Sequence, residues 1–493
     1  MAAPKRENQT VSQSLQKRTK KVHNQHQNNL ISHIDGVSSN PNRSGNLPDD
    51  ILDRIFSFLP IKQAVEIGVL SPRFKKSWLF NRKILFDREF SRHHDREEYI
   101  HIVNRVFNSH VGSRIQSLSL CFDPTAKEHM IERWLKICAE KGIEELDLDF
   151  FQGRDVFKIS QFLDIKSLTT LKLVYCEVDL PPQLTGLSFL TTLILKKVDL
   201  NTETMETLFF HCLLLETVDL WQCCNIQHLK VCARSLKRFK VLKVRHCTEI
   251  LSIDIDAPTL RSIYYIGNVV KFQFAEVLHL DEVLLNFSPS RCFAKASLVE
   301  NLVSDLSYAN VLTTTSAFLE GLTTRIRDGA FRDLQFRLWN LKEFQLFMEG
   351  TSYCNLFDIA SFLKNCPSLE KLFLDLNDFS FDCGFYWELH QKQLLQYFPH
   401  FFTGLKFIKV KGFKFQKHEL ELVRFLLGKA VFLETLVLVT PRTGRIRIYE
   451  PADAINYKRL IFSWRSSPKT DIVVLDHYHD KGPVQPKVSQ FGW

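Results

Sequence analysis

The sequence predicts an α/β fold, in which a small helical module near the N-terminus precedes a long solenoid with parallel strands inside its curve and helices outside. Two observations support this fold class. Residues 46–60, NLPDDILDRIFSFLP, carry apolar side chains at helical spacing, and short segments of alternating apolar residues recur from residue 115 onward. The chain has 493 residues, 45% hydrophobic and 24% charged, which is a globular composition with ample length for a large core.

The helical module is predicted to contain three short helices. Pro48 suits a first helical turn, Asp49 and Asp50 place negative charge at the favourable end of the helix dipole, and Pro60 ends the first helix. The apolar positions of the first helix are Ile51, Leu52, Ile55, Phe56 and Leu59; those of the second are Ile61, Ala64, Val65, Val69 and Leu70; those of the third are Phe74 and Trp78. Three short helices with this much apolar surface are marginally stable alone, so part of that surface should contact a partner or a neighbouring domain.

The alternating segments have a regular period. Successive apolar pairs begin at Leu118, Leu146, Leu171, Leu193, Val218 and Leu242, so the intervals are 28, 25, 22, 25 and 24 residues. This is the period of leucine-rich repeats, whose units must stack to bury their apolar faces. The same signal returns at 341–347, 369–376, 405–413 and 433–439, with helices expected on the convex side between them.

Strand alternation predicts which side chains face the core. Leu171 and Leu173 point inward, while Lys172 lies on the exposed concave face. Three cysteines, Cys176, Cys223 and Cys247, occupy the Asn/Cys position of the repeat, so we interpret them as turn-filling residues. The alternative, a zinc site formed by Cys223, Cys224, His228 and Cys232, lacks a second clustered ligand pair.

The middle of the chain, 260–335, is less regular. The segments LRSIYYIGN and AEVLHLDEV are interpreted as degenerate repeats. The stretch that follows is interpreted as helical segments broken by the polar run Thr313, Thr314 and Thr315.

No catalytic motif is present in the sequence, and we predict no catalytic residue, metal site or cofactor. The acidic residues at 147–149 and 254–256 alternate with aliphatic residues in strand register. DHYHD, at 476–480, combines two histidines with two aspartates beyond the last clear repeat, and we interpret it as part of a solvated tail.

The helical module resembles the F-box. The resemblance covers residues 46–86 and rests on Leu47-Pro48, Ile51-Leu52, Ile55, Leu59-Pro60, Val69-Leu70-Ser71, Arg73-Phe74 and Trp78. Phe74 stands where plant F-boxes often have Trp, a change that packing should tolerate. Residues 385–465 resemble the FBD-type region of plant F-box/leucine-rich-repeat proteins, through the turn Lys411-Gly412-Phe413 and the helix around Glu419-Leu420-Glu421-Leu422-Val423.

The resulting domain assignment has six parts: a disordered basic and polar tail (1–45), the F-box (46–86), a helical linker (87–114), leucine-rich repeats (115–384), FBD-like terminal repeats (385–465) and a C-terminal tail (466–493).

The F-box resemblance implies a non-catalytic subunit of an SCF-type ubiquitin ligase, which binds a Skp-family adaptor and through it a cullin. The implied adaptor-binding residues are Leu47, Pro48, Ile51, Leu52, Ile55, Leu59, Pro60, Val65 and Leu70. The repeats would then bind an unknown protein substrate through concave residues, of which the leading candidates are Lys172, Lys196, Trp221, Lys243 and Arg245. Tyr175, Lys197, Gln222 and His246 belong to the same candidate surface. Its basic and aromatic character would suit an acidic or phosphorylated ligand.

Two other functions remain open. The chain could be a scaffold whose helical module only stabilises the end of the solenoid, and failure to bind an adaptor would favour that reading. A nucleic-acid-binding role would draw on the net charge of +9, but the basic residues are dispersed and form no recognisable module. We expect an intracellular protein of the nucleus or cytoplasm without a membrane span; Lys17-Arg18-Thr19-Lys20-Lys21 is a candidate import signal.

Overall fold

The computed structural model describes residues 48–480, apart from residues 60, 71–75, 152, 154–155, 160–163, 179, 181–183, 278, 289–295, 324–335, 349–353, 378, 382–386, 397, 399 and 442–450. The predictions for the tail over 1–45, for its basic cluster, and for Leu47, Pro60, Ser71, Arg73 and Phe74 therefore lie outside the described residues.

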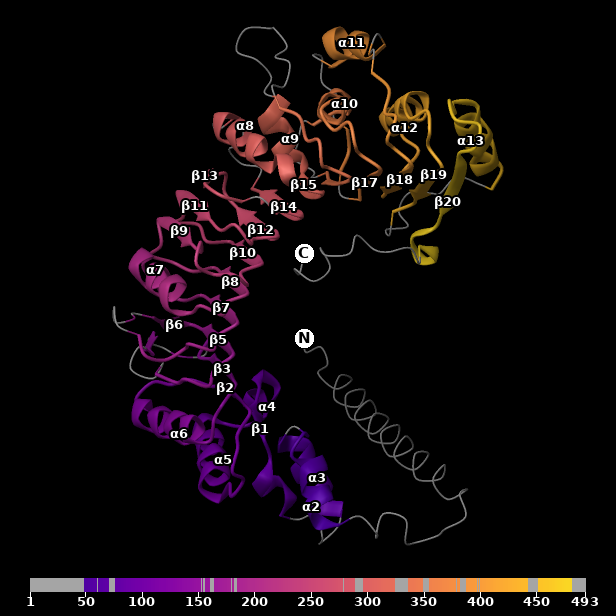
Figure 1. Cartoon of the computed structure of the whole chain (residues 1–493). Coiled ribbons are helices and arrows are strands. Elements are labelled where there is room, and N and C mark those ends of the chain that lie inside the picture. The colour runs from indigo at the N-terminus through magenta and orange to yellow at the C-terminus, as the bar shows by residue number, and fades with distance from the viewer. Residues whose placement is uncertain are drawn as a thin grey trace, which may run out of the picture.

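One parallel sheet of 15 strands runs through the described chain (Figure 1). Its strands follow the order of the sequence and are β1 (Lys83–Phe86), β2 (Ser117–Cys121), β3 (Glu145–Asp149), β5 (Thr170–Val174), β7 (Thr192–Lys196), β8 (Thr217–Trp221), β10 (Val241–Arg245), β12 (Ser262–Gly267), β14 (Glu282–Phe287), β15 (Val311–Thr315), β16 (Glu343–Phe347), β17 (Lys371–Asp375), β18 (Phe407–Lys411), β19 (Thr435–Val439) and β20 (Asp471–Leu475). This sheet, with helices on its outer side, confirms the predicted α/β solenoid.

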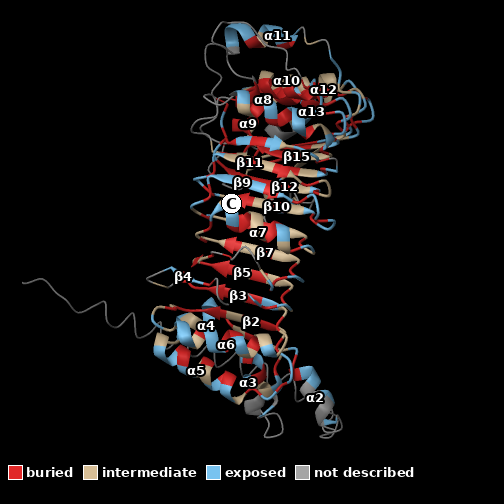
Figure 2. Ribbon diagram, turned by 60° about the vertical axis from the view of Figure 1, so that its left-hand side comes forward, coloured by how far each residue is buried: buried red, intermediate tan, exposed pale blue. Residues whose placement is uncertain are grey.

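Each strand pairs with the next so that the repeat positions align. Leu118 lies opposite Leu146, which in turn lies opposite Leu171. Buried positions alternate with less buried ones along these strands (Figure 2), and one continuous hydrophobic core extends from Ile61 to Ile472. Each strand therefore sends its second and fourth side chains into the core and its first, third and fifth toward the concave face.

The outer layer contains both helices and short strands. The helices are α5 (Arg96–Ser109), α6 (Glu128–Glu140), α7 (Thr202–His211), α8 (Ala296–Asp305), α9 (Ser316–Thr323), α10 (Leu356–Leu363), α11 (Lys392–Gln396), α12 (Lys417–Lys429) and α13 (Pro451–Ser463), with a π-helical turn η6 (Trp387–Gln391) and a 3₁₀ turn η5 (Leu306–Tyr308). The outer strands are β9 (His228–Cys232), β11 (Ser252–Asp256) and β13 (Lys271–Phe274), which form their own parallel sheet, and the pair β4 (Phe157–Lys158) and β6 (Cys176–Glu177).

The composition of this outer layer explains the shape of the solenoid. Parallel strands lie about 4.8 Å apart, whereas a helix with its side chains is about 10 Å wide. From β8 to β13 the outer layer consists of strands, so both sides have the same spacing and the repeats run nearly straight (Figure 1). From β14 to β20 helices form the outer layer, and their greater width forces the sheet to curve (Figure 1).

The helical module packs against the first strand. It consists of α2 (Asp49–Phe56), α3 (Ile61–Leu70) and the short 3₁₀ helix η2 (Ser77–Phe80), which stands where a third helix was predicted. Asn81, fully buried, joins the module to the sheet: its Nδ2 donates to Leu59 O at 2.7 Å and its Oδ1 accepts from Lys83 N at 2.7 Å. His110, which follows α5, binds Asn81 O through Nε2 at 2.8 Å, so this asparagine connects three segments.

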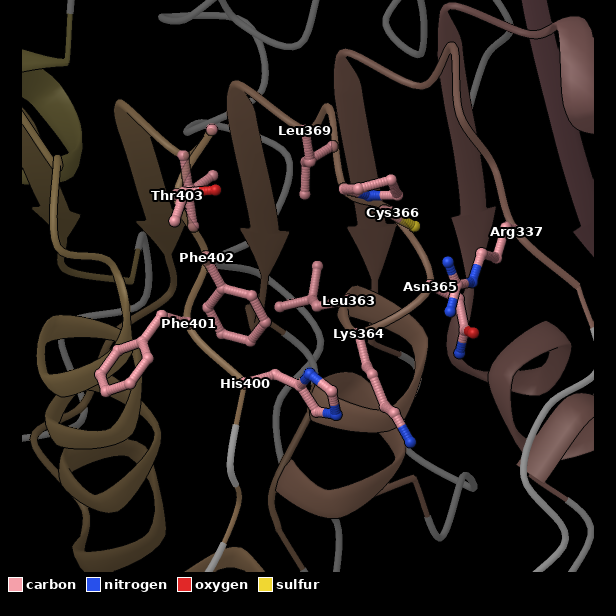
Figure 3. Close-up of a pocket in the computed structure, with 13 residues that line it drawn as sticks. Arg337, Leu363, Lys364, Asn365, Cys366, Leu369, His400, Phe401, Phe402 and Thr403 are labelled. Carbon is pink, nitrogen blue, oxygen red and sulfur yellow. The ribbon is translucent and has the colours of Figure 1, made fainter.

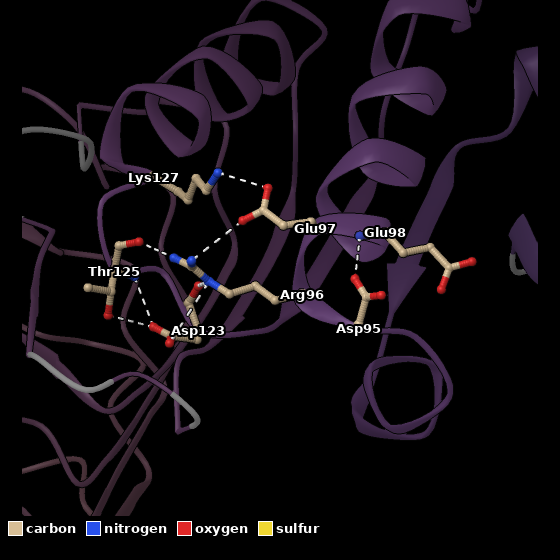
Figure 4. A network of polar contacts seen from close by, with 7 residues as sticks. All are labelled: Asp95, Arg96, Glu97, Glu98, Asp123, Thr125 and Lys127. Carbon is tan, nitrogen blue, oxygen red and sulfur yellow. Dashed lines mark hydrogen bonds and ion pairs between the residues drawn. The ribbon is translucent and has the colours of Figure 1, made fainter.

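A second set of contacts joins α5 to the loop after β2 (Figure 4). Asp95 caps the helix by accepting from Glu98 N at 2.8 Å. Arg96 donates through Nε to Asp123 O at 2.9 Å and through Nη2 to Thr125 O. Lys127 pairs with Glu97 at 3.1 Å. The linker helices are therefore fixed to the first repeats, and the helical module has a defined orientation on the solenoid.

Three expectations from the sequence require correction. The sheet begins with β1, inside the segment assigned to the helical module, and continues to β20, inside the segment assigned to the C-terminal tail. Strand β1 lacks an alternating pair of aliphatic residues, whereas β20 carries one, Ile472 and Val474, in a segment assigned to the tail. The polar run Thr313–Thr315 is the end of strand β15 and not a break between helices. Threonine is β-branched and suits a strand, and Thr314 satisfies its hydroxyl by donating to Leu285 O at 2.9 Å.

Candidate functional site

The outer side of the helical module exposes an apolar surface. Ile51, Ile55, Phe58 and Val65 are each between 43% and 49% exposed, although isoleucine, phenylalanine and valine are usually buried. Phe56, between them in sequence, is buried. The first helix thus buries one apolar side chain, Phe56, and leaves others exposed to solvent.

The described part of the chain contains five of the nine residues predicted to bind an adaptor. Pro48, Ile51, Ile55 and Val65 are exposed and Leu59 is half-buried. Leu47 and Pro60, and the side chains of Leu52 and Leu70, are outside the described residues. Phe58 was missed because it lies in the turn after α2, outside the helical spacing that selected the others.

The five candidate substrate residues lie together on the concave face of β5, β7, β8 and β10. Lys196, Trp221 and Arg245 occupy the fifth position of three adjacent strands and are aligned by the strand register. The Lys196 Nζ lies 3.7 Å from the centre of a Trp221 ring, and the Arg245 Cζ lies 4.7 Å from it. Trp221 is therefore flanked by two cations, an arrangement that stabilises both charges.

Two aspartates, Asp147 and Asp219, balance part of the positive charge of this surface. They were not among the residues predicted from the sequence. Asp219 accepts two bonds from Arg245 Nη2, at 2.8 and 2.7 Å, and both side chains are nearly buried. Asp147 accepts from Lys172 Nζ at 2.7 Å. Both aspartates occupy the middle position of a strand, where a side chain faces the concave surface. This position in the sequence could have identified them.

Burial affects the ionisation of this surface. It raises the pKa of Asp147, against the opposing effect of the bond from Lys172. Burial, together with the nearby positive charges of Arg88, Lys197 and Lys172, lowers the pKa of Lys196. A negative charge near Lys196, such as that of Asp149, favours its charged form.

Four other residues of the predicted surface occupy a different place. Tyr175, Lys197, Gln222 and His246 each follow the last residue of a strand and have positive φ values of 62°, 51°, 54° and 54°. They form a row in the turns at the strand ends and not on the sheet itself. The Lys197 Nζ lies 4.5 Å from the ring centre of Phe151, and the Arg88 Cζ lies 5.3 Å from it, so a second cationic and aromatic group borders this edge.

Buried cysteines fill the turns, as predicted. The thiol of Cys223 contacts Leu195 O at 3.4 Å and that of Cys247 contacts Leu220 O at 3.9 Å, each reaching the preceding strand. The ten described cysteines are free thiols. Among the described residues, no three His, Cys, Asp or Glu side chains are grouped so that they could hold a metal ion. No helix within the described ranges is long and apolar enough to cross a membrane.

A cavity of about 230 Å³ lies at the opposite edge of the sheet, where the chain enters β16, β17 and β18 (Figure 3). Leu363, Phe402 and the backbone at Gly404 line it, with Arg337 and His400 at its margin. It lies at the strand starts, away from the concave cluster around Trp221, and therefore does not belong to the same site.

The DHYHD segment is exposed at Asp476, Tyr478 and His479, as expected of a solvated segment, but its last residue is packed against the sheet. Asp480 Oδ1 lies 2.7 Å from Lys409 Nζ, and Oδ2 lies 3.8 Å from Lys411 Nζ. The side chains of Asp480 and Lys409 are only 6% and 4% exposed. Asp480 is therefore packed on the concave face of β18, through a contact between residues 71 apart that has no local signal in the sequence.

Comparison with known proteins identifies both parts of this architecture. Residues 45–83 match the F-box domain, and residues 106–460 match the family described as At1g61320/AtMIF1, LRR domain. The molecule is therefore an F-box protein with a leucine-rich-repeat solenoid.

Relatives from Arabidopsis thaliana extend the similarity over most of the chain. FBD-associated F-box protein At1g61320 is 33% identical over 431 residues, which cover 85% of this chain and 94% of the relative. F-box/FBD/LRR-repeat protein At5g53840 is 25% identical over 419 residues, or 81% and 88% of the two chains. F-box/FBD/LRR-repeat protein At1g13570 is 24% identical over 420 residues, or 82% and 92%. The chain belongs to the family of FBD-associated F-box proteins with leucine-rich repeats, which confirms the resemblance drawn from its motifs.

Proposed function

We propose that this protein is the substrate-recognition subunit of an SCF-type ubiquitin ligase. Its F-box would bind a Skp-family adaptor, and through it a cullin, while the repeats bind a protein substrate. The exposed apolar surface formed by Ile51, Ile55, Phe58 and Val65 carries this proposal, because an exposed patch on a module otherwise packed against its neighbour is typical of a protein interface.

The chain itself would contribute position and not bond chemistry. Asn81 and the Arg96 contacts hold the F-box in one orientation on the solenoid. A substrate on the concave face is then kept at a fixed distance from the ligase, which raises its effective concentration there.

The concave cluster around Trp221 is the proposed substrate surface. Lys196, Lys243 and Arg245 surround aromatic rings there, and the Lys243 Nζ lies 5.5 Å from the ring centre of Tyr264. Arginine and tryptophan are enriched among residues that dominate binding energies. We therefore propose an acidic segment of a protein as the ligand. Trp221→Ala should reduce substrate ubiquitination without reducing adaptor capture; equal ubiquitination by the variant would place the substrate elsewhere.

The test of adaptor binding is co-purification of the full chain with a Skp-family adaptor. The double variant Ile51→Asp, Ile55→Asp should lose at least about tenfold in capture, because two charges would be placed in an apolar interface. Both positions are exposed, so the fold should persist, which circular dichroism checks. Phe210→Asp is the matched control, since Phe210 is exposed on α7, and it should bind as the wild type does.

The competing function is a scaffold in which the helical module only caps the solenoid. The burial of Ile61 in the continuous core of the solenoid favours that role for the inner side of the module. If the folded wild-type chain captures no adaptor, capping the solenoid would be the function of the helical module.

A further inference from the structure

A groove of about 470 Å³ lies at the joint between the F-box and the solenoid. Three segments line it: α2 with the turn after it, the residues on either side of Asn81, and the loop that precedes β2. Each segment contributes one arginine, and these are Arg54, Arg82 and Arg114. None of the described lining residues is acidic, so the groove is suited to an anionic group.

Backbone hydrogen bonds fix the three segments to one another. Arg82 N donates to Ser57 O at 3.1 Å, which joins the residue before β1 to the turn after α2. Gly112 N donates to Leu79 O at 3.2 Å, which joins the loop before β2 to η2. A Cβ at Gly112 would lie only 3.2 Å from Phe80 Cα, so glycine permits this close approach. The arginines are therefore carried by a preorganised backbone, which lowers the cost of binding a ligand.

Two of the three arginines are available to a ligand. Arg114 pairs with Glu144, whereas Arg54 and Arg82 form no ion pair with any described residue. The Arg82 Cζ lies 5.7 Å from the ring centre of Phe58, with the guanidinium over the ring. A guanidinium that stacks on a ring through its face keeps the N–H groups at its edge for a carboxylate. Arg82 can therefore bind an anion without leaving Phe58.

The groove is continuous with the exposed apolar surface of the F-box. Phe58, which lies under Arg82, belongs to that surface and is 49% exposed. On α2, Arg54 lies three residues after Ile51, a spacing that places the two side chains on the same side of a helix. A protein that covers the apolar surface therefore also reaches both arginines. Covering them without a negative charge would be costly, because it would leave two cations unpaired in an interface.

We propose that the groove binds carboxylate side chains of the protein that covers the exposed apolar surface of the F-box. The identity of that protein as a Skp-family adaptor rests on the proposed function. The adaptor would present an acidic segment beside its apolar contact, and Arg54 and Arg82 would pair with this segment. Since salt screens charges at the edge of an interface, adaptor binding should weaken as the salt concentration rises.

The dissociation constant of the full chain for the adaptor, measured at about 50 mM and about 0.5 M NaCl, tests the role of the groove. The double variant Arg54→Gln, Arg82→Gln should raise the dissociation constant at low salt at least about tenfold and should reduce its salt dependence. Arg133→Gln, Arg238→Gln is the matched control. It removes the same charge from exposed positions outside the groove and should bind as the wild type does. Circular dichroism checks the fold of each variant.

Glu144→Gln should have the opposite effect on adaptor binding. It frees Arg114 from its acidic partner and so adds an available positive charge to the groove. The side chain of Arg114 is 52% exposed, so the loss of this ion pair should cost little stability. We expect the dissociation constant at low salt to fall about two- to threefold. A groove that only supports the fold would not bind the adaptor more tightly after this change.

The outcomes separate the groove from the ligase function. Suppose that Ile51→Asp, Ile55→Asp abolishes capture while Arg54→Gln, Arg82→Gln keeps the wild-type affinity and salt dependence. The proposal for the groove would then be overturned and the adaptor function would stand. Equal weakening by the control variant would also overturn it, because net charge would then explain the effect. A folded wild type that binds no adaptor at either salt concentration would contradict the adaptor function itself.

Discussion

The two halves of the solenoid share one pattern of buried residues but differ on both surfaces. From β3 to β10 the concave face carries acid and base pairs, such as Lys172 with Asp147 and Arg245 with Asp219. From β12 to β18 it carries apolar side chains such as Tyr264, Ile266 and Leu284, together with the buried pair of Lys409 and Asp480. The outer layer changes from strands to helices after β13, and curvature increases with it (Figure 1). Inward aliphatic residues are thus common to all repeats, while the concave side chains and the outer layer differ from one half to the other.

Glycine substitutions should give the largest effect and would show how tightly the curved half is packed. Gly412 has a φ of +69°, and a Cβ there would lie 2.4 Å from Asn377 N. Gly412→Ala should therefore cost about 3–5 kcal/mol in the free energy of unfolding, since it combines a left-handed conformation with a backbone clash. Urea denaturation measures this loss.

Gly428→Ala is the control in the same half. Gly428 lies in α12 with open space around its Cβ position, so alanine should stabilise the protein by about 0.5–1 kcal/mol through helix propensity. If the two variants unfolded at the same urea concentration, the turn at Gly412 would have to rearrange to accommodate the added Cβ.

Charge neutralisation should have a smaller effect and would test the pairs of the straight half. Asp219→Asn leaves Arg245 nearly buried without its bidentate partner and should cost about 2–3 kcal/mol. Asp147→Asn should cost less than about 1 kcal/mol, because Lys172 and Asp147 are each about a third or more exposed. Thermal denaturation measures both losses. If the two variants lose the same free energy of unfolding, the difference in burial does not determine how much each ion pair contributes to stability.

The smallest effect is expected at the joint between the F-box and the first strand. Burial lowers the pKa of His110, whose Nε2 donates to Asn81 O while Nδ1 lies 2.8 Å from Lys141 Nζ. The neutral ring is therefore the folded form. Its contribution to stability is complete above the unfolded pKa of about 6.5 and is lost as the pH falls through the lower folded value.

Thermal denaturation from pH 8 to pH 5 should show this loss for the wild type. His110→Gln, which has no titrating ring, should weaken it. An unchanged pH profile in this variant would assign the acid sensitivity to other groups.

The sequence was sufficient to predict the repeats whose strands contain two aliphatic residues at alternate positions, because alternation alone determines which side chains enter the core. It was insufficient for β1 and the threonine strand β15, where burial comes from neighbouring repeats and not from local pattern. Strand β20 does carry an alternating pair, Ile472 and Val474, but lies beyond the last repeat that was recognised. The F-box face was predicted in part: helical spacing selected Ile51 and Ile55 but grouped the buried Phe56 with them. Contacts such as Asp480 with Lys409 depend on the path of the whole chain and have no local signature.

The junction at Asn81 has a thermodynamic consequence. Because Ile61 of α3 belongs to the continuous core and Asn81 joins the F-box to β1, the F-box and the first repeats should unfold together. Consider a partner that binds the exposed side of α2 and α3 only when the F-box is folded. Its binding would then also stabilise the adjoining repeats against unfolding. The gain in free energy of unfolding is set by the partner's concentration relative to its dissociation constant. By the same linkage, a destabilised first repeat would weaken partner binding at a surface that it does not touch.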